Sequence, residues 1–187
     1  MRILLMFCLL MIGLPANAQE IAGVMVQETI LTDDGTTLHL NGAGIRTKVF
    51  FDIYIAELYM ENPSASAAEV IAAEGRKRII MHFLYKEVTK DKLVDAWNEG
   101  FKGNTGSEDL AGLQERIDRF NALFEDVKKN DVIVLDFAPS SGTTVTVKGM
   151  QKGEIPGKDF NDALLRIWLG DEPVTKSLKE QLLSYKK

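Results

Sequence analysis

The period of the apolar residues changes several times along the chain, and this order constrains the fold more than any other feature. Alternating, β-branched and aromatic runs predict strands, whereas an apolar residue at every third or fourth position predicts a helix. Because strands are grouped with strands and helices with helices, we expect an α+β domain in which helices cover an antiparallel sheet. The predicted strands are 24–31, 36–40, 45–60, 78–84, 131–137 and 143–148, and the predicted helices are 62–75, 89–101, 107–124, 157–170 and 175–185.

Turn residues divide these runs. Asp33-Asp34-Gly35 predicts a hairpin between the first two strands. The run 45–60 is too long for one strand, so a bend or tight hairpin is expected inside it. Gly42-Ala43-Gly44 lacks the third glycine and the following helix of a dinucleotide loop, which favours a turn or bulge. Thr89 and Ser107 are the expected N-caps of the two central helices.

The first eighteen residues have the pattern of a secretory signal peptide. Arg2 precedes an apolar run from 3 to 14, and Ala16-Asn17-Ala18 is a small-x-small cleavage site. The apolar run is shorter than the roughly 20 residues that span a bilayer, so an uncleaved anchor is the less favoured interpretation. We therefore predict a signal peptide over 1–18, a single domain over 19–187, no transmembrane segment after cleavage, and a periplasmic or secreted protein.

Composition excludes several classes of function. With 22 Lys and Arg against 27 Asp and Glu, the net charge of -5 argues against a nucleic-acid partner. The only cysteine, Cys8, lies in the predicted signal peptide, which leaves no disulfide or thiol nucleophile. The only histidines, His39 and His82, fit strand positions and no metal-ligand spacing, and no G-x-S-x-G turn is present. We expect no metal and no cofactor.

Arg46 is the cation that could bind a ligand. It begins an apolar, aromatic run, and its guanidinium has the geometry to bind a carboxylate or an enolate oxygen. Tyr54 has the same strand parity, but eight residues of straight strand span about 26 Å. The two side chains can meet only if the chain bends between them. The alternative is a surface arginine and an unrelated core tyrosine.

Several short motifs together resemble the chalcone isomerase-like domain family. They are Asn41-Gly42-Ala43-Gly44-Ile45-Arg46, Glu57-Leu58-Tyr59-Met60, and the segment 159–171 with Ile167-Trp168-Leu169-Gly170-Asp171. Their order and spacing extend the resemblance over about residues 20 to 185. It implies an open-faced β-sandwich, a large antiparallel sheet covered by helices, with a ligand cleft between them.

The resemblance also implies where ligand-binding residues lie. Arg46 falls on the arginine of the family. Tyr54 falls where true isomerases carry a threonine and the related fatty-acid-binding proteins a tyrosine. A wall of Phe50, Phe51 and Ile53 is expected beside them.

The other positions of the isomerase site depart from the catalytic pattern. Thr89 stands near the position of the active-site tyrosine, Ala96 near that of the asparagine, and Ile167 near that of a threonine on the last long helix. Asn98 could restore an amide if the register shifts by two residues. Ala96 and Ile167 cannot donate hydrogen bonds, which weakens the stabilisation that an enolate needs. No residue is therefore assigned as catalytic, and these four are possible cleft-lining positions.

Three functions remain open. The favoured one is binding of a fatty acid or similar apolar carboxylate without catalysis. The second is an isomerase or intramolecular lyase that acts on an enone such as a chalcone. The third is a structural or partner-binding envelope protein with no small-molecule ligand. The ligand, the protein partners and the oligomeric state are not determined by the sequence.

We predict that a secreting host cleaves the chain after Ala18, because the small residues at 16 and 18 suit signal peptidase. Intact-mass analysis of the exported protein should give a chain that begins at Gln19. A mature protein that retains residues 1–18 would contradict the prediction.

Overall fold

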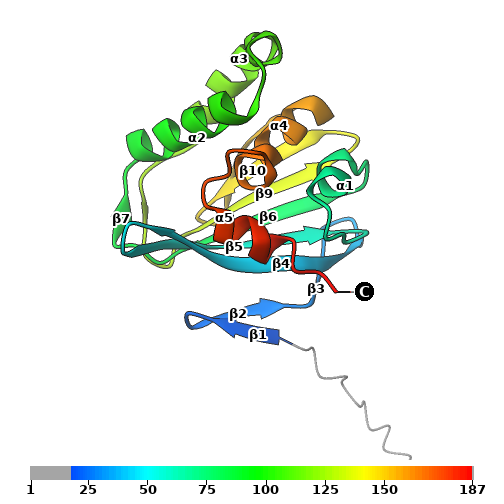
Figure 1. The fold of residues 1–187 in the computed structure, drawn as a ribbon, viewed down its shortest axis with the longest axis vertical. Coiled ribbons are helices and arrows are strands. Elements are labelled where there is room, and N and C mark those ends of the chain that lie inside the picture. Colours follow the sequence, from blue (N-terminus) through cyan, green and yellow to red (C-terminus); the bar gives the residue numbers. More distant parts are fainter. Residues whose placement is uncertain (1–17, 187) are drawn as a thin grey trace, which may run out of the picture.

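A seven-stranded antiparallel sheet forms the framework of the protein (Figure 1). The computed structural model describes residues 18–186, so the signal peptide predicted over 1–18 lies outside the described residues except for Ala18. The strand order is β11-β10-β9-β6-β5-β4-β3. The strands are β3 (Thr29–Leu31), β4 (Thr37–Lys48), β5 (Phe51–Met60), β6 (Lys77–Phe83), β9 (Val132–Ala138), β10 (Gly142–Val147) and β11 (Met150–Ile155).

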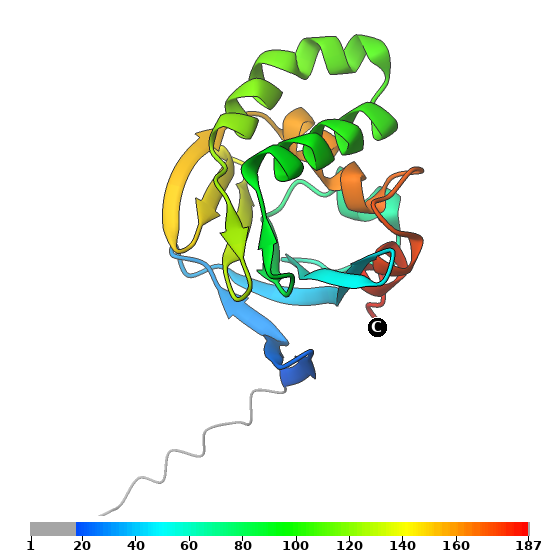
Figure 2. The same cartoon turned by 90° about the vertical axis from the view of Figure 1, so that its left-hand side faces the viewer.

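The helices cover one face of this sheet (Figures 1 and 2). They are α1 (Ala67–Ala72), α2 (Lys90–Asn104), α3 (Ser107–Ala122), α4 (Lys158–Leu169) and α5 (Lys176–Leu182). Two very short strands, β7 (Glu87–Val88) and β8 (Val127–Lys128), pair beside the ends of α2 and α3. The predicted α+β class and the open-faced sandwich are confirmed. No helix within residues 18–186 is both long and apolar enough to cross a membrane.

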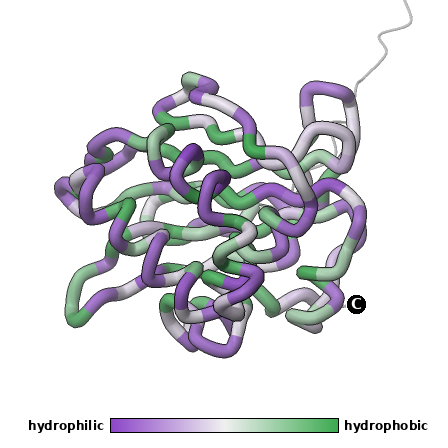
Figure 3. The backbone as a smooth tube through the Cα atoms, turned by 90° about the horizontal axis from the view of Figure 1, so that it is seen from above, coloured by the Kyte–Doolittle hydropathy of each residue, from purple (hydrophilic) through white to green (hydrophobic). Residues whose placement is uncertain are grey.

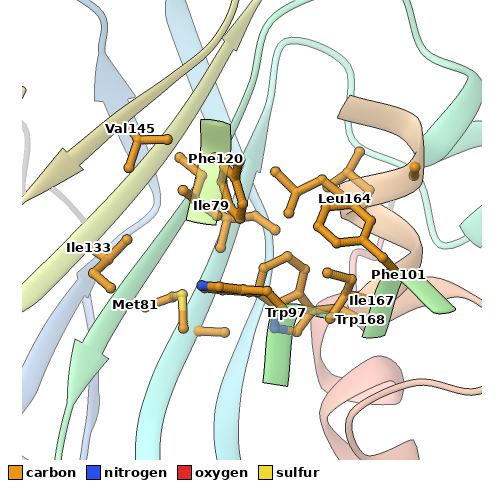
Figure 4. Packing of buried hydrophobic residues seen from close by; sticks show 14 of the residues in the cluster. Ile79, Met81, Trp97, Phe101, Phe120, Ile133, Val145, Leu164, Ile167 and Trp168 are labelled. Carbon is orange, nitrogen blue, oxygen red and sulfur yellow. The ribbon is translucent and has the colours of Figure 1, made fainter. Parts of the chain in front are cut away.

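Aromatic rings fill the space between sheet and helices (Figure 4). Trp97 of α2 lies 5.6 Å from both Phe120 of α3 and Trp168 of α4, measured between ring centroids. Phe160 of α4 lies 5.4 Å from Phe120. The stripes predicted on the helices are therefore the buried faces, as the period of 3.6 residues requires. Phe120, Phe124, Phe160, Leu164 and Trp168, which lie on these stripes, are all buried.

The opposite face of the sheet carries a hairpin of β1 (Ala18–Ile21) and β2 (Val24–Gln27). The Tyr59 hydroxyl lies 2.9 Å from the Gln27 carbonyl oxygen and 2.8 Å from Glu57 Oε2. His82 Nε2 lies 2.9 Å from the other carboxylate oxygen of Glu57. Burial, followed by the neighbouring Glu57 charge, raises the pKa of Tyr59. Tyr59, Glu57 and His82 thus form a connected polar group on this face.

The side chain of a buried lysine caps the C-terminal end of α1. Lys77 Nζ donates to the carbonyl oxygens of Ala73 at 2.8 Å and Ile71 at 3.1 Å. These carbonyls have no partner within a helix that stops there, so a cation is favoured at this end. Burial lowers the pKa of Lys77 to about 8, opposed by the carboxylate of Asp162.

Several boundaries differ from the sequence predictions. The expected strand 24–31 is two strands: β2 pairs with β1, and only β3 forms the hairpin with β4. The strand β11 was missed because it is charged, contains Gly153, and gains its order from backbone pairing with β10. The N-cap of α3 is Gly106 and not Ser107. Thr89 does cap α2, by accepting a hydrogen bond from the Lys92 amide.

The hairpin expected within 45–60 exists, and its turn lies between Lys48 and Phe51. Gly42-Ala43-Gly44 is a strand segment beside a bulge at Asn41. Of the two predicted alternatives, a turn or a bulge, the structure has the bulge. A Cβ on Gly42 would lie 2.2 Å from the Gln181 carbonyl oxygen of α5. The glycine is therefore needed because helix and strand backbones approach closely.

Replacing Phe120 with alanine should lower the free energy of unfolding by about 3–5 kcal/mol, because the ring is fully buried among other aromatic rings. Phe50→Ala is the matched control: Phe50 is 90% exposed and its loss should change stability by less than about 0.5 kcal/mol. Urea unfolding measures both. Equal effects of the two substitutions would contradict the observed packing.

Candidate functional site

The β4–β5 hairpin brings Arg46 and Tyr54 together. The two residues are directly opposed in the antiparallel register, and the Arg46 Cζ lies 5.6 Å from the centroid of the Tyr54 ring. A guanidinium at this distance from an aromatic face is attracted by the quadrupole of the ring. The bend that this contact requires is the turn at 49–50, and it brings the two side chains together.

The side chain of Tyr54 is fixed by a hydrogen bond from helix α4. Only 3% of Tyr54 is exposed, and its hydroxyl oxygen accepts a hydrogen bond of 3.0 Å from Trp168 Nε1. The Phe83 ring packs beside it, with centroids 5.6 Å apart. Burial raises the pKa of Tyr54, and the nearby Arg46 charge opposes the shift only in part. Tyr54 is therefore a neutral, fixed support for the guanidinium.

Arg46 lacks the partners that a half-buried guanidinium usually has. Its Nε is buried and makes no hydrogen bond, and the guanidinium forms no ion pair within residues 18–186. By contrast, Arg78 pairs with Asp136 and Arg116 with Asp159. An unpaired donor away from water costs free energy until an acceptor reaches it. The arrangement can accept an anionic group.

A pocket of about 290 Å³ opens beside Arg46. This volume is at the lower end of the range for small-molecule sites. Lys48 adds a second cation to the lining, and Glu99 and Glu172 add two exposed carboxylates. An anion would therefore be stabilised on the β4 side of the pocket. The complete lining is Arg46, Thr47, Lys48, Ala96, Glu99, Gly100, Glu172, Pro173 and Val174.

The apolar interior next to this pocket is filled by side chains. Tyr54, Trp97 and Trp168 are each at most 3% exposed; the Trp97 and Trp168 rings meet edge to face, and the Tyr54 ring packs against Phe83. The expected wall is not there: Phe50 and Phe51 lie on the exposed turn, and only Ile53 packs against the core. The pocket has room for a headgroup and a short apolar segment.

The other predicted positions have different environments. Ala96 lines the pocket, whereas Ile167 is fully buried and lies so close to Gly100 that a Cβ there would meet its Cγ2 at 2.8 Å. Thr89 caps α2, and the Asn98 side chain accepts a hydrogen bond from Asn121 on α3 at 2.8 Å. The structure thus brings Arg46 and Ala96 to one pocket with Tyr54 behind them, and leaves Thr89 and Asn98 outside its lining.

The sequence analysis missed two contributors to this site. Trp168 was named only within the motif of segment 159–171, although a buried indole N–H usually needs an acceptor and so signals a nearby polar group. The segment 172–174 follows α4 and carries no motif, so only the fold brings it opposite Arg46.

A larger groove of about 1250 Å³ runs along the outer edge of β4, between the β1–β2 hairpin and the chain after α5. Its charged residues include Glu28 and Lys186, which are exposed. Within residues 18–186 no cluster of three or more His, Cys, Asp or Glu side chains is arranged to hold a metal ion. The unpaired, half-buried Arg46 makes the smaller pocket the candidate site.

The comparisons agree with the fold. The family model described as chalcone isomerase-like matches residues 18–184. Because this match spans most of the sequence, the chain belongs to the chalcone isomerase-like family. No curated protein matches the sequence significantly.

The structure is similar to the crystal structure of a fatty-acid binding protein from Arabidopsis thaliana, AtFAP1. The TM-score is 0.64 and the sequence identity 18%, and the match covers 83% of this chain and 96% of that chain. At this identity the similarity establishes a shared fold.

Tyr54→Phe should destabilise the protein by about 1–3 kcal/mol, because it leaves the fully buried Trp168 N–H without an acceptor. Tyr85→Phe is the control, since the Tyr85 ring packs on Phe51 and its hydroxyl makes no hydrogen bond within residues 18–186. Chemical denaturation of both variants measures the difference. A Tyr54→Phe variant as stable as Tyr85→Phe would contradict the assigned hydrogen bond.

Proposed function

We propose that the protein binds an apolar carboxylate, of the fatty-acid class, with its headgroup at Arg46 and without catalysis. One observation carries the proposal: a guanidinium with a buried, unpaired Nε lines a pocket and has no ion-pair partner within residues 18–186. A carboxylate offers two acceptor oxygens to this group, and charge-assisted hydrogen bonds are about twice as strong as neutral ones. The fold shared with a fatty-acid binding protein supports the same ligand class.

The size of the pocket limits the ligand. A volume of about 290 Å³ suits a carboxylate with a short alkyl chain, or the head of a longer acid whose tail lies over Pro173 and Val174. Each buried methylene contributes about 0.8 kcal/mol, so affinity rises with chain length until the apolar surface is covered. Medium-chain acids should then bind nearly as well as long-chain acids.

The local chemistry favours binding over ring closure. Ala96 presents a methyl group to the pocket, and Ile167 is buried against Gly100. Neither can donate a hydrogen bond to an enolate, which catalysis of ring closure would require. Tyr54 acts here through its ring, which supports Arg46, because its hydroxyl is buried and bonded to Trp168.

The predicted signal peptide leads us to propose that binding takes place outside the cytoplasm. Cleavage after Ala18 would remove one of the four residue pairs of the β1–β2 hairpin and leave those of Gln19, Glu20 and Ile21. The proposed processing is thus compatible with the described fold.

Arg46→Ala should weaken octanoate binding about 10- to 150-fold, which is about 1.5–3 kcal/mol for a lost charged hydrogen bond. Arg46→Lys should recover part of this loss, because it keeps the charge but not the planar fork. Arg119→Ala, a change of an exposed arginine on α3, is the matched control and should bind like the wild type. Isothermal titration calorimetry with a series of acids and their methyl esters measures each affinity.

Thermal unfolding of each variant separates lost binding from lost structure. Equal binding of acid and ester, or wild-type affinity in a folded Arg46→Ala variant, would contradict the proposal.

A further inference from the structure

The turn between β4 and β5 exposes three consecutive large apolar residues. Val49 is 77% exposed, Phe50 90% and Phe51 56%. The other highly exposed large apolar residues within 18–186 are Met25, Leu31 and Met150, which lie singly on separate strands. Isolated apolar residues are common on protein surfaces, whereas a contiguous group at one point indicates an interaction site.

This turn projects beyond the rest of the sheet. β5 pairs with β6 only from Tyr54 onward, so residues 48–52 extend past the end of the neighbouring strand. The turn lies at the left end of Figure 1 beside β7, and Figure 3 shows it as a hydrophobic loop that stands out from the molecule. Its base is braced by the Phe51–Tyr85 ring contact of 5.5 Å. Because the Phe51–Tyr85 contact holds the base of the turn, the turn can contact a partner surface without any change in the sheet.

Three lysines lie near the base of the projection in a chain whose net charge is -5. Lys48 adjoins the turn, Lys86 follows Tyr85, and the Lys129 amide donates to the Lys86 carbonyl at 3.3 Å. These three side chains are exposed and form no ion pair within residues 18–186.

Two carboxylates near the turn have partners. Asp52 accepts a hydrogen bond from Thr47, and Glu87 pairs with Lys128 at 3.6 Å. The apolar tip is therefore flanked by three lysines that form no ion pair within residues 18–186, with the carboxylates of Asp52, Glu99 and Glu172 also nearby.

We propose that the β4–β5 turn docks on an anionic lipid bilayer, with Val49, Phe50 and Phe51 inserted at the interface and the lysines on lipid headgroups. Aromatic and aliphatic side chains flanked by lysines match the layered chemistry of a membrane surface, where an apolar interior underlies charged headgroups. A projecting turn can insert into a deformable bilayer. A rigid protein partner would instead need an apolar pocket of matching shape with acidic residues around it.

The proposed membrane contact lies next to the candidate pocket. Thr47 and Lys48 belong both to the base of the turn and to the pocket lining. A docked molecule would therefore hold Arg46 close to the headgroup layer, from which an amphipathic carboxylate could transfer. The docking itself does not depend on the proposed ligand.

Co-sedimentation with phosphatidylcholine vesicles, with and without phosphatidylglycerol, tests the docking. The wild type should bind the anionic vesicles, and added salt should weaken this binding because the lysine contribution is screened. Phe50→Asp should lower the partition coefficient at least about tenfold, since one buried aromatic side chain is lost and a charge is added. Leu31→Asp is the matched control: Leu31 is 68% exposed, on the strand that pairs with the opposite end of β4, and its variant should bind like the wild type.

A tryptophan reporter tests insertion directly. Phe50→Trp should show a blue shift of its emission on adding anionic vesicles, whereas Leu31→Trp should not. The native Trp97 and Trp168 are at most 3% exposed, so their emission provides a constant background. Thermal unfolding should be unchanged by Phe50→Asp, because Phe50 lies on the exposed turn.

Three results would overturn the proposal: no vesicle binding by the wild type, equal binding by wild type and Phe50→Asp, or no spectral shift of Phe50→Trp. Sedimentation velocity without lipid adds a fourth, since self-association of the wild type that Phe50→Asp abolishes would assign the turn to a second copy. The vesicle assays contain no carboxylate ligand, and Phe50→Asp should still bind octanoate in solution. Failure of the docking and failure of the proposed function are thus separate outcomes.

Discussion

The antiparallel pairing of β4 with β5 is the constraint on which the site depends. Its register places Arg46 opposite Tyr54, and the same strands carry Gly42, which lets α5 approach the sheet. Because side chains alternate across a strand, a slip of one residue would turn Arg46 to the opposite face of the sheet. The turn that closes this hairpin also forms the exposed apolar tip. One local pairing therefore fixes the cation, its aromatic support and the projecting surface.

Aromatic packing decides how much room a ligand has. The helices α2, α3 and α4 bring Trp97, Phe120 and Trp168 onto the sheet, and their rings leave the open space at the rim, beside Arg46. A protein interior packs as densely as an organic crystal, so these large rings occupy the volume that an alkyl chain would need. A small pocket at the edge of a filled core is the result. Membership of the chalcone isomerase-like family gives the scaffold, and these side chains give the scaffold its particular pocket.

The charges of the site follow from the same packing. Tyr54 is buried and held by Trp168, so it remains a neutral ring beneath the guanidinium. Arg46 is half-buried and lines the pocket, where a permanent cation that has no ion-pair partner within residues 18–186 favours an anion. Lys48, Lys86 and Lys129, which form no ion pair within residues 18–186, lie near the β4–β5 turn. The headgroup of the proposed ligand and those of the proposed membrane would thus contact the same end of the molecule.

The sequence by itself determined the α+β class, the buried stripes of α2, α3 and α4, and a bend or hairpin within 45–60, because periodicity and element length are local properties of the chain. It also singled out Arg46 and Tyr54 as a pair that needed a bend. Only the tertiary structure decided that Trp168 bonds to Tyr54, that the 172–174 segment closes the pocket, and that Phe50 and Phe51 face solvent. The strand β11 and the role of Gly42 were likewise invisible, since both depend on neighbours that are distant in sequence. Local patterns specify which face of an element is apolar, but the distance between elements, and hence the cavity, is set by how the side chains of several elements pack together.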